Sequence, residues 1–185
     1  MHMVSRLGLI AAFATVGAYG PVFSAADGKA KPTELHAPDS AAKKVGKQTL
    51  DSAPLNAVLK KHLKQGRIDY ESLQADAASR AQLQTYVEAI AAMPEGEPLS
   101  SWINAYNALV VHAVLERYPL ASIKDAAGGD FKFFREIHYS VAGVQRSLDD
   151  IENGVIRPRF EDARIHVALN CGALSCPPLA LKAFE

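Results

Sequence analysis

The chain has 185 residues and equal numbers of acidic and basic side chains, 20 of each, so its formal net charge is zero. A chain of this length is large enough for one domain with a substantial hydrophobic core. The balanced charge argues against nucleic acid, or an anionic membrane surface, as the main partner.

The N-terminus has the pattern of a secretory signal peptide. Arg6 supplies a short positive region, an apolar run covers residues 7–23, and Ser24-Ala25-Ala26 offers small residues before a cut at Asp27. The alternative is an uncleaved membrane anchor, but the run is short for a span and is broken near its end. We therefore expect residues 1–26 to be removed. The mature protein is then predicted to be periplasmic or secreted, without stable insertion into a membrane.

Residues 27–47 are polar and rich in Lys and Ala, which predicts a flexible linker. A single domain is expected over residues 48–185. Apolar residues recur at helical spacing over about 51–65 and about 81–93, so these segments are predicted to be its first two helices.

The third predicted helix runs from Ser100 or Ser101 to about Tyr118 and is apolar nearly all round, which predicts a buried helix. Asn104 and Asn107 lie three residues apart on one of its faces. A buried amide left without partners costs about 1–3 kcal/mol, so both side chains need hydrogen bonds. They either fasten neighbouring loops to the core or line a binding site.

A β-hairpin is predicted over residues 131–146, which are rich in aromatic and β-branched side chains. Ala142-Gly143 provides its turn, and His138 lies in its first arm. A short helix precedes the hairpin, opened by the capping-box pattern Ser122-Ile123-Lys124-Asp125.

A further helix is predicted to begin with a second capping box, Ser147-Leu148-Asp149-Asp150. It is expected to run to about Arg157 and to end at Pro158, which lacks a backbone donor. Glu152 lies beside its apolar stripe. Taken together, the elements predict an α+β fold in which a helical N-terminal half packs on a small mixed or antiparallel sheet.

The last stretch, residues 165–178, holds both cysteines. Residues 165–169 alternate between apolar and polar or small side chains, which predicts a half-buried strand. Pro177-Pro178 and residues 179–184 predict a helix that begins just after Cys176. A thiolate at this position would be stabilised by the helix dipole and by free N–H groups.

Five ordered motifs resemble one family, the domain of unknown function 547. They are Gly66-Arg67-Ile68-Asp69-Tyr70, Trp102-Ile103-Asn104-Ala105-Tyr106-Asn107-Ala108-Leu109, Tyr118-Pro119-Leu120-Ala121-Ser122-Ile123, Ser147-Leu148-Asp149-Asp150-Ile151-Glu152, and residues 164–179 with both cysteines. The resemblance implies kinship with exported bacterial proteins and with plant proteins, but it assigns no reaction. Family members usually continue well past the Cys-Pro-Pro segment, so we expect this chain to be incomplete at its C-terminus.

One hypothesis for the cysteines is a structural disulfide. Export would place Cys171 and Cys176 in an oxidising compartment, and five residues across a turn bring them close enough to bridge. On this hypothesis the protein is a non-catalytic periplasmic binding or scaffold module, with an unknown small molecule or peptide as its partner.

The second hypothesis is nucleophilic catalysis. Cys176 would attack an amide or thioester in a hydrolase or acyl transferase, with His138 or His166 as the base, and Cys171 is a further candidate catalytic residue. A polar side chain would orient the base, and three are candidates: Asn104, Glu152 and Asn170.

A metal site is the third hypothesis. Zinc sites usually combine a Cys pair with a second ligand pair at regular spacing, and this sequence shows no second pair. We therefore expect no metal and no cofactor.

Overall fold

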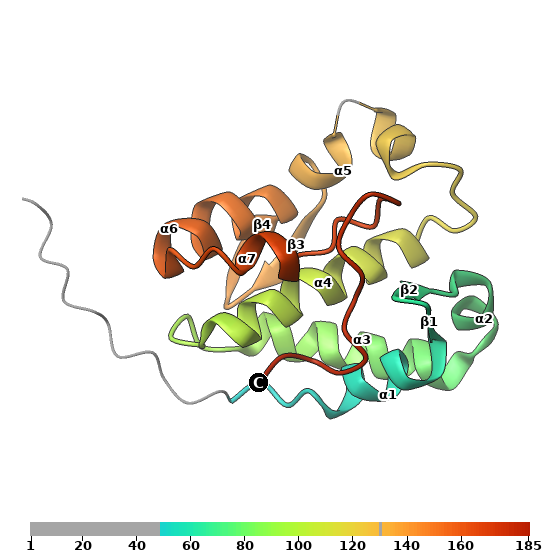
Figure 1. Cartoon of the computed structure of the whole chain (residues 1–185), viewed down its shortest axis with the longest axis horizontal. Helices are drawn as coiled ribbons and strands as arrows, with labels where there is room; N and C mark the ends of the chain where they lie inside the picture. The colour runs from blue at the N-terminus through green and yellow to red at the C-terminus, as the bar shows by residue number, and fades with distance from the viewer. Residues whose placement is uncertain (1–48, 130) are drawn as a thin grey trace, which may run out of the picture. The chain divides into compact units, whose positions relative to one another are not determined.

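The computed structural model describes residues 49–129 and 131–185, which belong to one compact unit. The predicted signal peptide and linker, residues 1–26 and 27–47, lie outside the described residues. Helices and two short hairpins follow one another along the chain (Figure 1). The helices are α1 (Ala53–His62), α2 (Tyr70–Ala75), α3 (Ala77–Ala92), α4 (Leu99–Leu115), the 3₁₀-helix η1 (Ile123–Gly128), α5 (Lys132–Arg135), the π-helix η2 (Asp150–Ile156), α6 (Arg157–Phe160) and α7 (Ile165–Ala168). The strands are β1 (Leu63–Lys64), β2 (Arg67–Ile68), β3 (His138–Val141) and β4 (Val144–Ser147).

The predicted α+β class is confirmed. The N-terminal half is helical, and the sheets are two antiparallel hairpins, β1–β2 and β3–β4. The turn Ala142-Gly143 joins β3 to β4 as predicted, with positive φ at both residues. Its two N–H groups donate to the carbonyls of Ile90 and Ala91, so the hairpin turn is fastened to the end of α3. The segment before β3 is helix α5 and not an extension of the strand.

Helix α4 lies in the centre of the hydrophobic core. Almost every side chain from Ser101 to Leu115 is buried, including Trp102 and Tyr106, because the helix is apolar on nearly all its faces. Helix α3 packs against α4, and η2 contacts α4 from another side (Figure 1). None of the helices within the described residues combines the length and apolarity that a membrane span needs.

Two predictions for the last stretch are wrong. Residues 165–168 form helix α7 in place of a strand, and the segment after Pro177-Pro178 is irregular in place of a helix. The alternation of apolar and polar side chains was too short to distinguish a strand from a helix. In the structure the Asp162 carboxylate accepts the N–H of Arg164, which stabilises the first turn of a helix. A residue that precedes a proline avoids the helical region, which disfavours a helix beginning at the proline pair.

The predicted helix end at Pro158 is also wrong, since the helix continues to Phe160. In an α-helix the proline ring collides with the carbonyl of the residue four positions earlier. The turn before Pro158 is π-helical, because the Arg157 N–H bonds to the Glu152 carbonyl, five residues earlier. This wider turn moves the carbonyl of the residue four positions before Pro158 away from the proline ring. The chain leaves the helix at Glu161, in a left-handed conformation.

Replacing Trp102 by alanine is expected to lower the free energy of unfolding by about 3–5 kcal/mol, because the side chain is fully buried in α4. Urea denaturation would measure the change. Val144→Ala is the control: this side chain is 49% exposed, so its replacement should change stability by less than about 0.5 kcal/mol. If the two variants lose similar amounts of the free energy of unfolding, the burial of α4 is contradicted.

The capping box at Ser147 and Asp150 is formed in both directions: the Ser147 N–H and hydroxyl donate to the Asp150 carboxylate, and the Asp150 N–H donates to the Ser147 hydroxyl. Hydrogen bonding from the Ser147 N–H and then from its hydroxyl lowers the pKa of Asp150. The stability this gives is present above the unfolded pKa of about 3.9 and is lost as the pH falls through the folded value.

We therefore expect the stability difference between the wild type and Asp150→Asn to shrink as the pH falls below about 4. Urea denaturation at a series of pH values would measure it. A difference that stays constant down to about pH 2 would show that the capping carboxylate is not held in its charged form.

Candidate functional site

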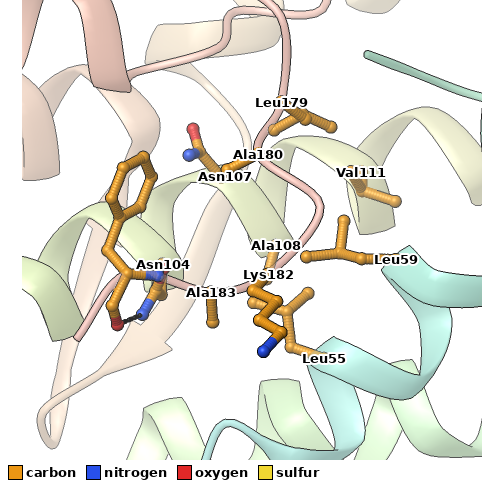
Figure 2. Close-up of a pocket in the computed structure, with 11 residues that line it drawn as sticks. Leu55, Leu59, Asn104, Asn107, Ala108, Val111, Leu179, Ala180, Lys182 and Ala183 are labelled. Atoms are coloured by element: carbon orange, nitrogen blue, oxygen red, sulfur yellow. Dashed lines mark hydrogen bonds between the residues drawn. The ribbon is translucent and has the colours of Figure 1, made fainter. Parts of the chain in front are cut away.

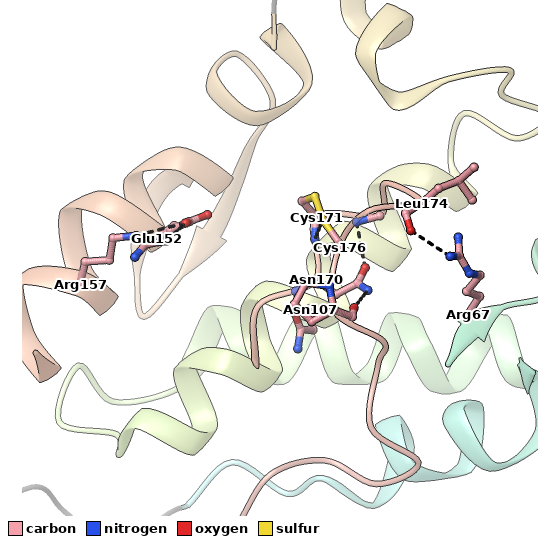
Figure 3. The surroundings of a disulfide bond; sticks show 10 residues. Arg67, Asn107, Glu152, Arg157, Asn170, Cys171, Leu174 and Cys176 are labelled. Carbon is pink, nitrogen blue, oxygen red and sulfur yellow. Dashed lines mark hydrogen bonds and ion pairs between the residues drawn. A yellow bond between two sulfur atoms is a disulfide. The ribbon is translucent and has the colours of Figure 1, made fainter. Parts of the chain in front are cut away.

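Cys171 and Cys176 form a disulfide that closes a loop of the C-terminal segment (Figure 3). Their Cα atoms are 6.1 Å apart, and the described residues contain no free cysteine. Within the loop, the Cys176 N–H donates to the Ala173 carbonyl, and the Cys171 N–H lies 3.3 Å from the Cys176 sulfur. Both sulfurs are therefore held in the bridge.

Asn107 and Asn170 hold the base of this loop. The Asn107 amide accepts the N–H of Asn170 at 2.8 Å and donates to the Ala168 carbonyl at 3.0 Å. Asn170 in turn accepts the Gly172 N–H and donates to the Pro177 carbonyl. One buried side chain of α4 thus fixes the chain just before the disulfide.

Asn104 holds the last residues in the same way. Its amide accepts the Phe184 N–H at 2.8 Å and donates to the Phe184 carbonyl at 2.9 Å (Figure 2). The neighbouring Ala183 N–H donates to Asn56 of α1. A cavity of about 20 Å³ remains between this segment, α1 and α4, which is room for about one water molecule and not for a larger ligand.

The β1–β2 hairpin also fixes the disulfide loop. Arg67 donates to the Leu174 carbonyl, and the Gly66 carbonyl accepts the Leu179 N–H. Gly66 has φ +77°, and a Cβ placed there would lie 2.4 Å from Cβ of Pro178. A glycine is required at this position for both its conformation and the close approach.

A cleft of about 710 Å³ opens beside the disulfide loop, within the size range of small-molecule sites. The loop contributes Cys171 to Leu174 to its lining, and Glu152 of η2, Lys124 and Ser122 contribute polar side chains. Most of the other lining side chains are aromatic or aliphatic, among them Tyr70, Tyr118, Leu120, Ile123, Phe131 and Phe134.

Among the residues that the structure describes, Glu152 supplies the carboxylate that lines this cleft, and the π-helix determines how it is paired. The Arg157 guanidinium donates to Glu152 with an Nη2–Oε1 distance of 2.6 Å (Figure 3). In an α-helix, residues five apart lie about 140° from each other round the axis and do not meet. In the π-helical turn the Arg157 N–H bonds the Glu152 carbonyl, so the two side chains lie on the same face.

Tyrosine hydroxyls complete the polar part of the cleft. Burial and then the charge of Glu152 hold the pKa of Tyr106 well above its usual range. Burial also raises the pKa of Tyr70, whose ring stacks on that of Tyr118 with 6.4 Å between centroids. These hydroxyls therefore remain protonated donors at neutral pH.

The two candidate histidines lie on other elements and bond elsewhere. The His138 ring is hydrogen bonded to the Glu136 carbonyl, and both ring nitrogens of His166 lie 3.3 Å from Arg157. His166 therefore connects to Glu152 through Arg157. No group of His, Cys, Asp and Glu side chains within the described residues is arranged to hold a metal ion.

The structure thus joins five of the proposed site residues into one region: Asn107, Glu152, Asn170, Cys171 and Cys176. Asn104 holds a segment farther along the chain. Sequence reasoning missed the aromatic lining and Arg157. Tyr106 lies between the two asparagines on a helix that the sequence predicts only to be buried. A side-chain pair five residues apart is not expected in an α-helix.

A family model described as "Protein of unknown function, DUF547" matches residues 90–185, just over half of the chain. The chain belongs to this family. The matched region contains α4, η2 and the disulfide loop, and therefore most of the lining of the cleft. No curated protein and no solved structure matches the DUF547 chain.

Gly66→Ala is expected to lower the free energy of unfolding by about 2–4 kcal/mol, because it adds a clash with Pro178 to the cost of a left-handed alanine. Gly143→Ala is the matched control, since Gly143 has nearly the same φ, +75°, and an added Cβ meets nothing within 4 Å. It should cost only about 1 kcal/mol. If urea denaturation shows that both variants lose the same free energy of unfolding, Gly66 does not pack closely against Pro178.

Proposed function

We propose that this protein is an exported, non-catalytic binding module that takes a small molecule or a peptide side chain into the cleft beside its disulfide loop. The observation that carries the proposal is the bridge between Cys171 and Cys176: it occupies both sulfurs, and Cys171 is itself part of the cleft lining. The bridge thus favours a binding role over nucleophilic catalysis.

The composition of the cleft supports ligand binding. A ligand site is typically a concave, mostly apolar surface with a few polar groups that orient the ligand. Here the aromatic and aliphatic walls supply the apolar surface, and the polar groups include those of Ser122, Lys124 and Glu152. Phe131 is 55% exposed and has φ +60°, an unusual conformation for a bulky residue and one that is often found at functional sites.

The disulfide also supports export to the periplasm or the exterior. Disulfides persist in oxidising compartments and are rare in the cytosol. This agrees with the signal peptide predicted for residues 1–26. A thiol titration of the protein isolated from the oxidising compartment should therefore detect no reactive cysteine until a reductant is added.

Binding of a neutral fluorescent probe such as Nile red would test the module. We expect the oxidised protein to bind it, and the double variant Cys171→Ser, Cys176→Ser to bind it about three- to tenfold more weakly, equivalent to about 0.6–1.4 kcal/mol. Loss of the bridge lets the loop that lines the cleft sample more conformations.

Ser175→Ala is the control, because it changes the same loop and leaves the bridge intact. Circular dichroism would establish that all variants remain folded. Binding that does not depend on the bridge would argue against a cleft shaped by the disulfide.

The second candidate function is the cysteine-dependent hydrolase or acyl transferase, and one contact favours it. The Cys171 N–H that points at the Cys176 sulfur would stabilise a Cys176 thiolate after reduction of the bridge. Two thiols that react without reductant in the freshly isolated protein would favour this function over the binding module.

A further inference from the structure

We infer that the cleft selects an organic cation, an ammonium group carried on an aromatic or aliphatic body. This assignment rests on the proposed binding function and names the chemistry of its ligand. Two independent features of the cleft attract positive charge: the Glu152 carboxylate and the aromatic rings of the walls.

Glu152 presents a carboxylate that is already ordered. Its Oε1 atom accepts two hydrogen bonds from Arg157, and its side chain is only 23% exposed. A carboxylate has about four acceptor positions, so these bonds leave capacity for a further donor. Figure 3 shows the carboxylate directed from η2 toward the disulfide loop, the side on which the cleft lies.

The rings of the wall favour the same charge. Tyr70, Tyr118, Phe131 and Phe134 all line the cleft and are at least partly exposed. The faces of aromatic rings are electron-rich, and they attract ammonium groups most strongly where water is displaced. The apolar body of the ligand would meanwhile cover the aliphatic part of the wall.

The positive charges near the cleft do not reverse this preference. The Arg157 guanidinium and the Glu152 carboxylate offset one another's charge, but only Glu152 is part of the lining, so the negative end of the pair faces the cleft. Lys124 does line the cleft, but it is exposed, so solvent and salt screen its repulsion. A ligand buried in the cleft therefore meets the oxygens of Glu152 before it meets either positive charge.

Three probes with the same ring and different head groups test the assignment: 2-phenylethylamine, 2-phenylethanol and phenylacetate. Calorimetry on the oxidised full-length protein is expected to give the amine about tenfold higher affinity than the alcohol, with the carboxylate weakest. Glu152→Gln should lower the affinity for the amine about tenfold and leave that for the alcohol almost unchanged.

Two variants separate charge from structure. Glu152→Asp keeps the charge and should retain part of the preference, and Glu88→Gln on α3, away from the lining of the cleft, should leave it intact. Equal binding of amine and alcohol, or a preference for phenylacetate, would overturn the cation assignment and leave the binding function standing. Failure of all three probes to bind would overturn the binding function as well.

Discussion

The C-terminal part of this protein depends on two amide side chains of one buried helix. After α7 the chain forms almost no regular structure, so its backbone polar groups lack the usual partners. Asn107 and Asn104 replace them, each pairing with both a backbone N–H and a backbone carbonyl. Because α4 is fixed by the core, an irregular segment acquires a defined position without becoming a helix or strand.

Two local departures from regular geometry shape the cleft. The disulfide closes the loop from Cys171 to Cys176, and the π-helical turn brings Arg157 over Glu152. π-helical turns are rare and often occur at functional sites, which agrees with a binding role for the residue that this turn orients.

The state of the two sulfurs separates the two functions considered for this DUF547 protein. In the bridged form the loop is part of a mostly apolar site, whose polar lining residues include Ser122, Lys124 and Glu152. In a reduced form, Cys176 would gain a backbone donor but would still need a base, and both candidate histidines bond to other groups. The contacts therefore support recognition more directly than catalysis.

The sequence determined the features that depend on local chemistry and on apolar periodicity: the buried helix α4, the β3–β4 turn, the capping box at Ser147 and the need of Asn104 and Asn107 for partners. It also established the family. Only the tertiary structure decided the path of the chain after Leu169, because contacts with α4 and with the β1–β2 hairpin override a weak local preference in short segments. The pairing of Glu152 with Arg157 was likewise decided by the tertiary structure. The periodicity of apolar residues in the sequence does not show that this turn contains one residue more than an α-helical turn.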